Sequence, residues 1–384
     1  MDFDLIVVGG GPVGASLACA AHGLSVALVA HERAPNAAPA ALDARVYALS
    51  PGNVAFLREL GAWEHMPPER LVPVREMRVF GDERSEIRFD AYRAGVPELA
   101  WIAEDAMLQH ALWAAVQKAG NIEIFAPADC EHMEVSDQHV LLALRDGSEL
   151  AGSLVAGADG ANSFVRRHAG ITAQERDYPQ AAVVANFSCE YPHRETAFQW
   201  FQRGPVLALL PLPGQHVSMV WSLPCAEAER ISQLAADALC RALEDASRHE
   251  LGRMTLATPP RSYPLRRLCA RRMVAPRIAL AGDAAHVIHP LAGQGLNLGL
   301  QDARALCAVL GARESARGPG DLRLLRRYER SRAEAVLSMD LMVDGIFRLF
   351  GADSAALAGL RNGGLNLSER MPVLKNILMR HAMS

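Results

Sequence analysis

The chain has 384 residues, and 50% of them are hydrophobic, so it is long enough to form two domains with a sizeable core. A formal net charge of −4 gives no electrostatic basis for binding nucleic acid. The seven cysteines include no CxxC pair, which argues against a disulfide framework or a zinc knuckle and favours a reducing cytoplasm. No stretch reaches the roughly 18 consecutive apolar residues of a membrane span, so we expect any membrane contact to be peripheral.

A short apolar strand, a glycine-rich turn and a helix of small residues open the chain. The strand is expected at Asp4–Val8 and the helix at Ala15–His22. Between them, Gly9, Gly11 and Gly14 form a GxGxxG pattern in the strand-turn-helix context of dinucleotide-binding domains. The sequence therefore predicts that a dinucleotide lies against the first turn of this helix.

The acid that holds the ribose of such a dinucleotide is less clearly marked. A second strand is expected at Val26–Val29, and the next residue, Ala30, has no side-chain acceptor. Counting about 20 residues forward from the glycines reaches Glu32, which is our candidate. The alternative is that Glu32 is a solvated loop residue and that other groups hold the ribose.

A second strand-turn-helix signal lies between Arg277 and Asp302. An apolar strand at Arg277–Ala281 leads into Gly282 and Asp283, whose carboxylate suits a ribityl or ribose hydroxyl. A glycine-containing loop follows, and a helix is expected from Asn297 to Leu310. The free amides at a helix start favour a ring that becomes anionic on reduction. We also expect a side chain at Gly295 to occupy the space of that ring, with backbone strain if its φ is positive.

Metal catalysis and serine hydrolysis are alternatives to a cofactor in this segment. Asp283, His286 and His289 are spaced by three residues, which would place them on one face of a regular helix. Pro290 and the glycines after it disfavour such a helix, and no further ligand set is evident. No GxSxG nucleophile elbow occurs either. We therefore expect no metal site and no serine-histidine hydrolase.

Two kinds of pattern alternate along the chain and predict two domains in an α/β fold. Short strands mix with helices in one set of segments, whereas β-rich composition in the other set indicates an inserted antiparallel sheet. The cofactor domain is predicted at 1–72, 100–170 and 265–384, with C-terminal helices that include 321–350, and the substrate domain at 73–99 and 171–264. Within the substrate domain, we expect strands at 181–190, 197–202, 206–212 and 216–223 and one helix near 226–247.

Three motifs in order resemble those of the single-component flavin aromatic hydroxylases. They are GGGPVG from Gly9, AGADGANSFVR at Ala156–Arg166, and GDAAH at Gly282–His286. The string HPLAGQGLNLG from His289, closed by Asp302, is similar to the signature of the branch that hydroxylates ubiquinone precursors. The resemblance covers nearly the whole chain and implies a three-layer, Rossmann-like FAD-binding domain. One departure is Ala30, where most relatives would have an acid, and it puts the ribose contact in doubt.

The resemblance also implies roles for individual residues. Arg45 would lie beside the FAD phosphates, although a surface arginine is the alternative, and Gln109 would touch the cofactor or be a solvated helical residue. Asp159, Gly160 and Arg166 would serve both FAD and the nicotinamide donor. The residues implied at the pyrophosphate are Gly9, Gly11 and Gly14; at the ribityl chain, Gly282 and Asp283; and at the isoalloxazine, Pro290, Gly293, Gln294, Gly295, Leu296 and Asn297. Of these, Pro290, Gly293 and Gly295 form the catalytic loop, and no side-chain acid or base is assigned.

The activity implied by the resemblance is hydroxylation of a polyprenyl phenol or quinol precursor of ubiquinone. NAD(P)H would reduce FAD, and O2 would form a flavin 4a-hydroperoxide whose distal oxygen is transferred to the ring. A dry, apolar pocket is needed, and strand residues such as Trp200, Phe201, Leu209 and Trp221 are candidates, although alternation turns half of them away. The alternatives are a hydroxylase of a soluble phenol and a non-catalytic flavin-containing subunit of a quinone-biosynthesis complex.

Partner contacts beyond the aromatic substrate and O2 remain open at this level. The segment Ser368–Met383 has apolar and basic sides, which suits a membrane surface or a partner protein. The alternative is a short helix docked on its own protein. We expect the protein in the cytoplasm. Any contact with a membrane is expected to be peripheral, and a contact with a quinone-biosynthesis complex is the other possibility.

Overall fold

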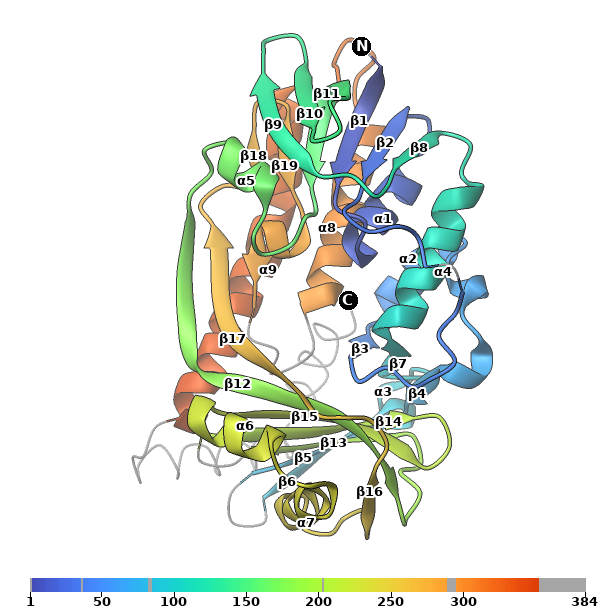
Figure 1. Ribbon diagram of the computed structural model, residues 1–384, viewed down its shortest axis with the longest axis vertical. Coiled ribbons are helices and arrows are strands. Elements are labelled where there is room, and N and C mark those ends of the chain that lie inside the picture. Colours follow the sequence, from blue (N-terminus) through green and yellow to red (C-terminus); the bar gives the residue numbers. More distant parts are fainter. Residues whose placement is uncertain (1, 36, 82–84, 202–203, 289–294, 352–384) are drawn as a thin grey trace.

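The computed structural model describes residues 2–35, 37–81, 85–201, 204–288 and 295–351, with side chains as far as Ser338. It confirms the predicted α/β class, with one largely parallel sheet, one largely antiparallel sheet and C-terminal helices (Figure 1). A small third sheet joins them. The C-terminal segment Ser368–Met383 lies outside the described residues.

The first sheet carries the N-terminal strand at its centre. β1 pairs in parallel with β11 on one side and with β2 on the other, and β19 and β8 extend the parallel part outward. The strands along this sheet are β18 (Val274–Ala275), β19 (Ile278–Leu280), β11 (Glu149–Gly157), β1 (Phe3–Val8), β2 (Val26–Val29) and β8 (Ile122–Phe125), with the antiparallel pair β9 (Cys130–Val135) and β10 (Val140–Leu144) beside β11. The strands expected at the N-terminus and before Gly282 are thereby confirmed.

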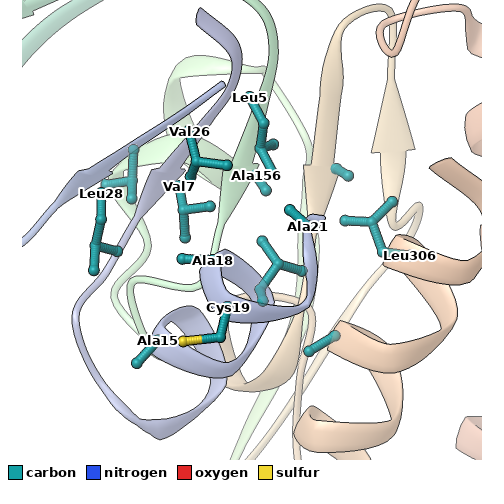
Figure 2. Close-up of a cluster of buried hydrophobic side chains, with 14 of the residues drawn as sticks. Leu5, Val7, Ala15, Ala18, Cys19, Ala21, Val26, Leu28, Ala156 and Leu306 are labelled. Atoms are coloured by element: carbon teal, nitrogen blue, oxygen red, sulfur yellow. The ribbon is translucent and has the colours of Figure 1, made fainter. Parts of the chain in front are cut away.

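Helices with small or apolar inner faces pack on this sheet. The side chains of Ala15 and Ala18 on α1 are fully buried against β1, and Leu306 reaches the same cluster from α8 (Figure 2). Because α1 presents such small side chains, it packs closely between its neighbours, α4 and α8. The helices of this part are α1 (Pro12–Ala20), α2 (Pro51–Glu59), α4 (Asp105–Lys118), α5 (Phe164–His168), α8 (Gly295–Gly311) and α9 (Leu322–Gly351).

The second sheet is built mainly from the inserted segment. Its strands pair antiparallel except β5 and β13, which pair in parallel. In order they are β20 (His286–Val287), β17 (Arg261–Ala270), β12 (Ala173–Cys189), β15 (His216–Pro224), β14 (Val206–Leu212), β13 (Thr196–Phe201), β5 (Glu76–Phe80) and β6 (Glu86–Asp90), with β16 (Met254–Leu256) beside β12. The domain limits themselves remain a prediction.

Two helices, not one, follow these strands. The single helix expected near 226–247 is wrong, because the chain breaks between α6 (Cys225–Ser232) and α7 (Ala236–Ala246). The break lets Ile231 of α6 and Leu239 of α7 both pack on the same face of the sheet. α7 lies on the side of this sheet away from the first sheet (Figure 1).

That outer face also takes up three of the four residues expected in the substrate pocket. Trp200, Leu209 and Trp221 are buried in the cluster beneath α6 and α7. Their assignment to the pocket is therefore wrong, because the strand alternation points them away from the first sheet. Phe201 follows Trp200 and lies on the opposite face of the strand.

The inner face of the second sheet meets the small third sheet. This sheet consists of β3 (Val46–Leu49), β7 (Ala100–Glu104) and β4 (Val72–Val74), with α3 (Ala91–Ala94) and the 3₁₀ turns Trp63–His65 and Pro68–Arg70 nearby. Ala197 and Leu212 of the second sheet pack against Ile102 of β7. Among the helices that the structure describes, none is both long and apolar enough to cross a bilayer.

Candidate functional site

Three turns that carry the sequence motifs lie at one edge of the first sheet. Val8, Gly157 and Leu280 are aligned across the parallel strands β1, β11 and β19. The chain leaves these strands into Gly9, Asp159 and Asp283, respectively. Because the carboxyl ends of parallel strands meet at the same edge, motifs separated by more than 270 residues form one continuous site.

The first turn, Gly9–Gly14, is held together by backbone packing. Gly9 has a φ of +119°, and a Cβ there would lie 2.2 Å from the carbonyl oxygen of Ala158. A Cβ on Gly14 would lie 1.9 Å from the carbonyl oxygen of Gly9. By contrast, a Cβ on Gly11 would meet no atom within 4 Å. Gly9 and Gly14 are therefore required by packing, whereas Gly11 leaves open space at the start of α1, where a pyrophosphate can approach the helix amides.

Trp113 closes the back of this turn, and the sequence reading missed it. Its Nε1 donates a hydrogen bond of 3.0 Å to the carbonyl oxygen of Gly10. A Cβ on Gly10 would lie 2.8 Å from the Trp113 ring and 2.6 Å from the Cβ of Ala30. Gly10 is thus constrained by packing, as Gly9 and Gly14 are. The signal in the sequence was the middle glycine of GGG, Gly10, a position that the GxGxxG pattern leaves unspecified.

Two further residues proposed to contact the cofactor, Gln109 and Glu32, come from segments near the first turn. Gln109 is half-buried one helical turn before Trp113 on α4, and Glu32 is exposed two residues after the buried Ala30. The exposure of Glu32 is compatible with either of its two assignments, the ribose contact or a solvated loop residue. Both contacts with the cofactor stay predictions.

The second turn presents a carboxylate that the protein leaves half satisfied. Oδ2 of Asp159 accepts a hydrogen bond of 3.1 Å from the amide of Val165. Oδ1 is buried and has no partner among the described residues. Burial raises the pKa of this carboxyl group. Gly160 follows with a φ of +77° and open space on its Cβ side, so a hydroxyl or amide donor of a bound molecule fits here.

Arg166 connects the second turn to the third. It is buried, and its guanidinium donates to the carbonyl oxygen of Ala284 at 2.9 Å and to that of Ala161 at 2.8 Å. Burial lowers the pKa of this guanidinium. The side chain therefore fixes two motifs relative to each other, and a direct contact with FAD or its donor stays a prediction.

The third turn exposes Asp283. Gly282 has a φ of +60° and begins the 3₁₀ turn Gly282–Ala284. The Asp283 side chain is accessible to solvent, yet the surrounding protein desolvates it enough to raise its carboxyl pKa, against the opposing charges of His286 and Arg45. The Asp283 carboxylate is placed to accept hydrogen bonds from ligand hydroxyls.

Arg45 lies where the two large sheets approach each other. Its Nη1 is 3.5 Å from Oδ2 of Asp105 on α4, and its guanidinium lies 5.5 Å from the centre of the Tyr263 ring on β17. Desolvation raises the pKa of Asp105. The Arg45 side chain is still largely exposed, so it keeps donors for an anion. Its contact with the FAD phosphates stays a prediction.

The start of α8 faces the same edge, and the described part begins at Gly295. The φ of Gly295 lies outside the left-handed region, and a Cβ there would meet no atom within 4 Å. The condition for backbone strain at this glycine is therefore not met, because the residue already belongs to the regular helix. Pro290, Gly293 and Gln294 lie outside the described residues, and the ring contacts of Gly295 and Leu296 stay predictions.

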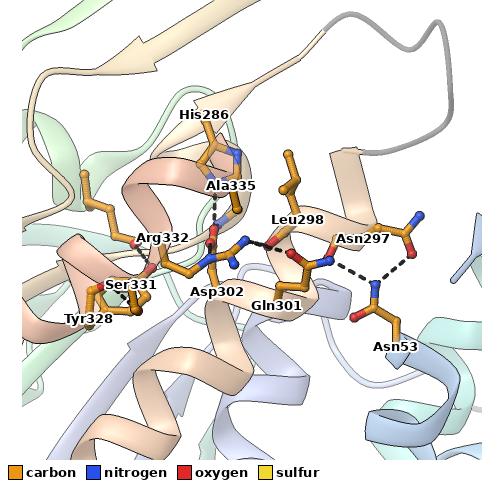
Figure 3. A network of polar contacts seen from close by, with 12 residues as sticks. Asn53, His286, Asn297, Leu298, Gln301, Asp302, Tyr328, Ser331, Arg332 and Ala335 are labelled. Carbon is orange, nitrogen blue, oxygen red and sulfur yellow. Dashed lines mark hydrogen bonds and ion pairs between the residues drawn. The ribbon is translucent and has the colours of Figure 1, made fainter. Parts of the chain in front are cut away.

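Asn297 anchors this helix start to the neighbouring segment. Its Oδ1 accepts a hydrogen bond of 2.8 Å from Nδ2 of Asn53 (Figure 3). The same oxygen accepts from the amide of Ser50 at 2.9 Å, and Nδ2 of Asn297 donates to the carbonyl oxygen of Ala48 at 2.8 Å. The side chain is buried. The structure thus assigns Asn297 a positioning role, and its contact with the cofactor stays a prediction.

A buried charge network holds the third turn and α8 in place. Asp302 Oδ2 accepts from the amide of Gly282 at 2.9 Å and from Nε2 of His286 at 2.6 Å, and Oδ1 accepts from Nε of Arg332 at 2.7 Å (Figure 3). Arg332 comes from α9 and also donates to Gln301 Oε1 at 3.1 Å. Sequence reasoning included Asp302 only as the end of a signature and missed Arg332, which lies 30 residues further on.

The charges in this network shift each other's pKa values. Burial alone would raise the pKa of Asp302, but His286 and Arg332 outweigh it and hold the value below its ordinary range. Burial alone would lower the pKa of His286, but the carboxylate of Asp302 outweighs it and raises the value. A charged pair is therefore favoured in the folded protein. Nδ1 of His286 is buried without a partner among the described residues.

The first and third turns also touch each other through Val13. A Cβ on Gly299 of α8 would lie 2.6 Å from Cγ2 of Val13, and one on Gly282 would lie 3.1 Å from the same atom. Glycine at both positions lets α1, α8 and the third turn pack in direct contact. The first and third turns and the start of α8 are therefore in direct contact. Residues 289–294 are not described.

Metal binding finds no support in the part of the chain that the structure describes. No group of three or more His, Cys, Asp or Glu side chains gathers there in an arrangement that could hold an ion. His286 bonds to Asp302, and His289 lies outside the described residues. Open space at Gly11, the unpartnered Oδ1 of Asp159 and the accessible Asp283 fit an elongated cofactor with phosphates and hydroxyls instead.

Comparisons with known proteins agree with this geometry. The model of the FAD binding domain family matches residues 2–339. The chain is 34% identical to the 3-demethoxyubiquinol 3-hydroxylase of Escherichia coli over 99% of this chain and 98% of the relative. It is 33% identical to the ubiquinone hydroxylase UbiL of Rhodospirillum rubrum over 99% and 89%. The solved structure of PqsL, a probable FAD-dependent monooxygenase from Pseudomonas aeruginosa, superimposes with a TM-score of 0.79 at 23% identity and covers 95% of this chain and 99% of that one.

Proposed function

Since the chain belongs to the FAD binding domain family, we propose that it is an FAD-dependent monooxygenase that hydroxylates the aromatic ring of a polyprenyl phenol or quinol in ubiquinone biosynthesis. NAD(P)H is the electron donor and O2 the oxidant. Bound FAD supplies the redox chemistry, because it accepts electrons from a nicotinamide and activates O2 for transfer to an electron-rich ring.

The observation that carries the proposal is the alignment of three turns at one sheet edge. Gly11 leaves room for the pyrophosphate at the start of α1, and Asp283 offers an accessible carboxylate to the ribityl hydroxyls. These two points follow different strands of the same sheet, and Asp159 follows β11, the strand between them. An extended dinucleotide fits this arrangement better than a compact ligand.

Other residues of the chain supply position and charge. The amides at the start of α8 have no partners within the helix, so they can donate to the flavin ring and favour its anionic reduced form. Asp302, on the same helix, bonds to Gly282 and His286. These bonds connect α8 to the turn that carries Asp283. The chain thereby provides preorganised donors, and no side-chain acid or base is assigned to the ring.

The composition of the second sheet favours a hydrophobic, uncharged substrate. β14 and β15, VLALLPL and HVSMVWSLP, contain no Lys, Arg, Asp or Glu. Alternation directs Ala208, Leu210 and Val220 toward the inner face, opposite the tryptophans of the outer cluster. A ring that carries a carboxylate would need a buried cation here, whereas a prenylated ring needs apolar contacts. The names of the E. coli and R. rubrum relatives point to the same substrate class.

We also propose that the protein is located in a reducing compartment. All seven cysteines are free thiols, and no disulfide links the described parts of the chain. We therefore place the protein in the cytoplasm.

The test is coupled turnover with two substrates. The FAD-loaded protein is mixed with NADH or NADPH and either a phenol bearing a short prenyl chain or the same ring without the chain, and donor oxidation, hydroxylated product and hydrogen peroxide are quantified. We expect one product molecule per donor oxidised with the prenylated ring. Product from the chain-free ring alone would favour a hydroxylase of soluble phenols. An absence of donor oxidation under all conditions would favour a non-catalytic flavin subunit.

A further inference from the structure

A pocket on the outside of the first sheet is lined by three arginines. It has a volume of 330 Å³ and lies between the edge strand β18 and the first turns of α9. Arg271, Arg272 and Arg326 contribute the positively charged part of its wall. The rest of the lining is Val274, Ala275, Pro276, Leu322 and Glu329.

These three guanidinium groups differ from the arginines around them. Arg327 pairs with Glu314 at 2.6 Å, and Arg332 pairs with Asp302 at 2.7 Å. Among the described residues, no side chain bonds or pairs with those of Arg271, Arg272 and Arg326, and all three are exposed. Three guanidinium groups that line one pocket repel one another, and a bound anion would relieve that repulsion.

Glu329, the acidic residue in the pocket, does not neutralise the three arginines. Oε1 of Glu329 accepts a hydrogen bond of 2.8 Å from the amide of Met273, which holds α9 against the strand. One carboxylate leaves the pocket with an excess of positive charge. Guanidinium groups bind phosphate oxygens through paired N–H donors, so phosphate is the anion that suits the pocket.

The apolar part of the wall favours a phosphate that carries a hydrocarbon group over inorganic phosphate. Val274, Pro276 and Leu322 offer contacts to hydrocarbon that inorganic phosphate cannot use. We propose that this pocket binds the phosphate headgroup of an anionic phospholipid and docks the protein on a membrane surface. The choice of a lipid over a soluble phosphate rests on the proposed function, because a polyprenylated substrate resides in the bilayer.

The test measures binding to vesicles, without turnover. Wild-type protein loaded with FAD is sedimented with vesicles of phosphatidylcholine alone and with vesicles containing phosphatidylglycerol. The triple variant Arg271→Gln, Arg272→Gln, Arg326→Gln removes the pocket's charge. The matched control Arg93→Gln, Arg145→Gln, Arg241→Gln removes three exposed arginines from other elements. Equal melting temperature and FAD content show that both variants are folded.

We expect wild type and control to bind the phosphatidylglycerol vesicles, more weakly as salt is added, and the pocket variant to bind about 100-fold more weakly. Hydroxylation of a short-chain substrate in solution should be unchanged in both variants, which separates this test from that of the proposed function. Equal weakening in both variants would show general charge attraction and overturn the site. Full competition by glycerol phosphate at the concentration of the lipid phosphate would show a soluble-phosphate site, and no vesicle binding by wild type would also overturn the proposal.

Discussion

The two turns that bracket the site are held in opposite ways. The first turn contains no charged side chain and is fixed by close backbone packing among Gly9, Gly14 and Ala158. The third turn presents the accessible side chain of Asp283 and is fixed by the buried charges of Asp302, His286 and Arg332. The first turn should therefore respond to added volume and the third to lost charge or altered pH.

Loss of Asp302 should be the most damaging change. Asp302→Ala leaves Arg332 and His286 buried without their counter-charge, which typically costs about 3–5 kcal/mol. Urea unfolding of the apoprotein measures this loss, and Asp302→Asn, which keeps the size and an acceptor for the Gly282 amide, should lose less. A loss of less than about 1 kcal/mol in Asp302→Ala would be close to that of an ordinary surface substitution. Such a result would show that the network does not hold the turn.

Added volume should break the first turn at one glycine and spare it at another. Gly14→Ala places a methyl group against the carbonyl oxygen of Gly9 and should destabilise the protein by about 1–3 kcal/mol or more. Gly11→Ala meets no protein atom, so it should change stability by less than about 0.5 kcal/mol while blocking the approach of FAD. Thermal unfolding and FAD titration separate the two effects. Equal stability of the two variants would contradict the packing account.

Asp283 should matter to the ligand and not to the fold. Hydrogen bonds to a charged group are worth about 1.5–3 kcal/mol, so Asp283→Ala should weaken FAD binding about tenfold or more. Flavin fluorescence titration gives the dissociation constant, and apoprotein unfolding is the control, which should not change. Unaltered FAD affinity would remove Asp283 from the site.

The charged network should make stability depend on pH. The raised pKa of His286 means that its contribution is complete below the unfolded value of about 6.5 and is lost as pH rises through the folded value. The lowered pKa of Asp302 means that its contribution is present above about 3.9 and is lost as pH falls through the folded value. The stability difference between wild type and His286→Gln should thus shrink above pH ~6.5. The stability difference between wild type and Gly11→Ala should not change with pH. If it shrank over the same pH range, titration of His286 would not be the cause of the pH dependence.

Gly295 should be the least sensitive position. Alanine there meets no atom and extends a helix, so stability should stay equal or rise by up to about 1 kcal/mol. Thermal unfolding of the apoprotein checks this, and a drop of more than about 2 kcal/mol would show a structural role that the backbone geometry does not indicate. Hydroxylation by Gly295→Val tests separately whether the helix start faces the ring.

The same contrast explains what could be predicted from the sequence. The first turn is local, so spacing alone located Gly9, Gly11 and Gly14. Arg332, which bonds to Asp302, comes from α9, and Trp113, which bonds to Gly10, comes from α4. No local pattern indicates that these two side chains reach the turns. The strands of the second sheet were located by composition. Their faces were not, because alternation alone does not determine which side packs beneath α6 and α7.

The most direct test of the proposed activity is the origin of the oxygen in the product. FAD-loaded protein is supplied with NAD(P)H and a prenylated phenol under ¹⁸O2, and mass spectrometry measures how much ¹⁸O the product contains. We predict one ¹⁸O atom in each hydroxylated ring and one donor molecule oxidised per product. Donor oxidation that yields only labelled hydrogen peroxide, with the ring unchanged, would contradict the assignment as a monooxygenase of this substrate.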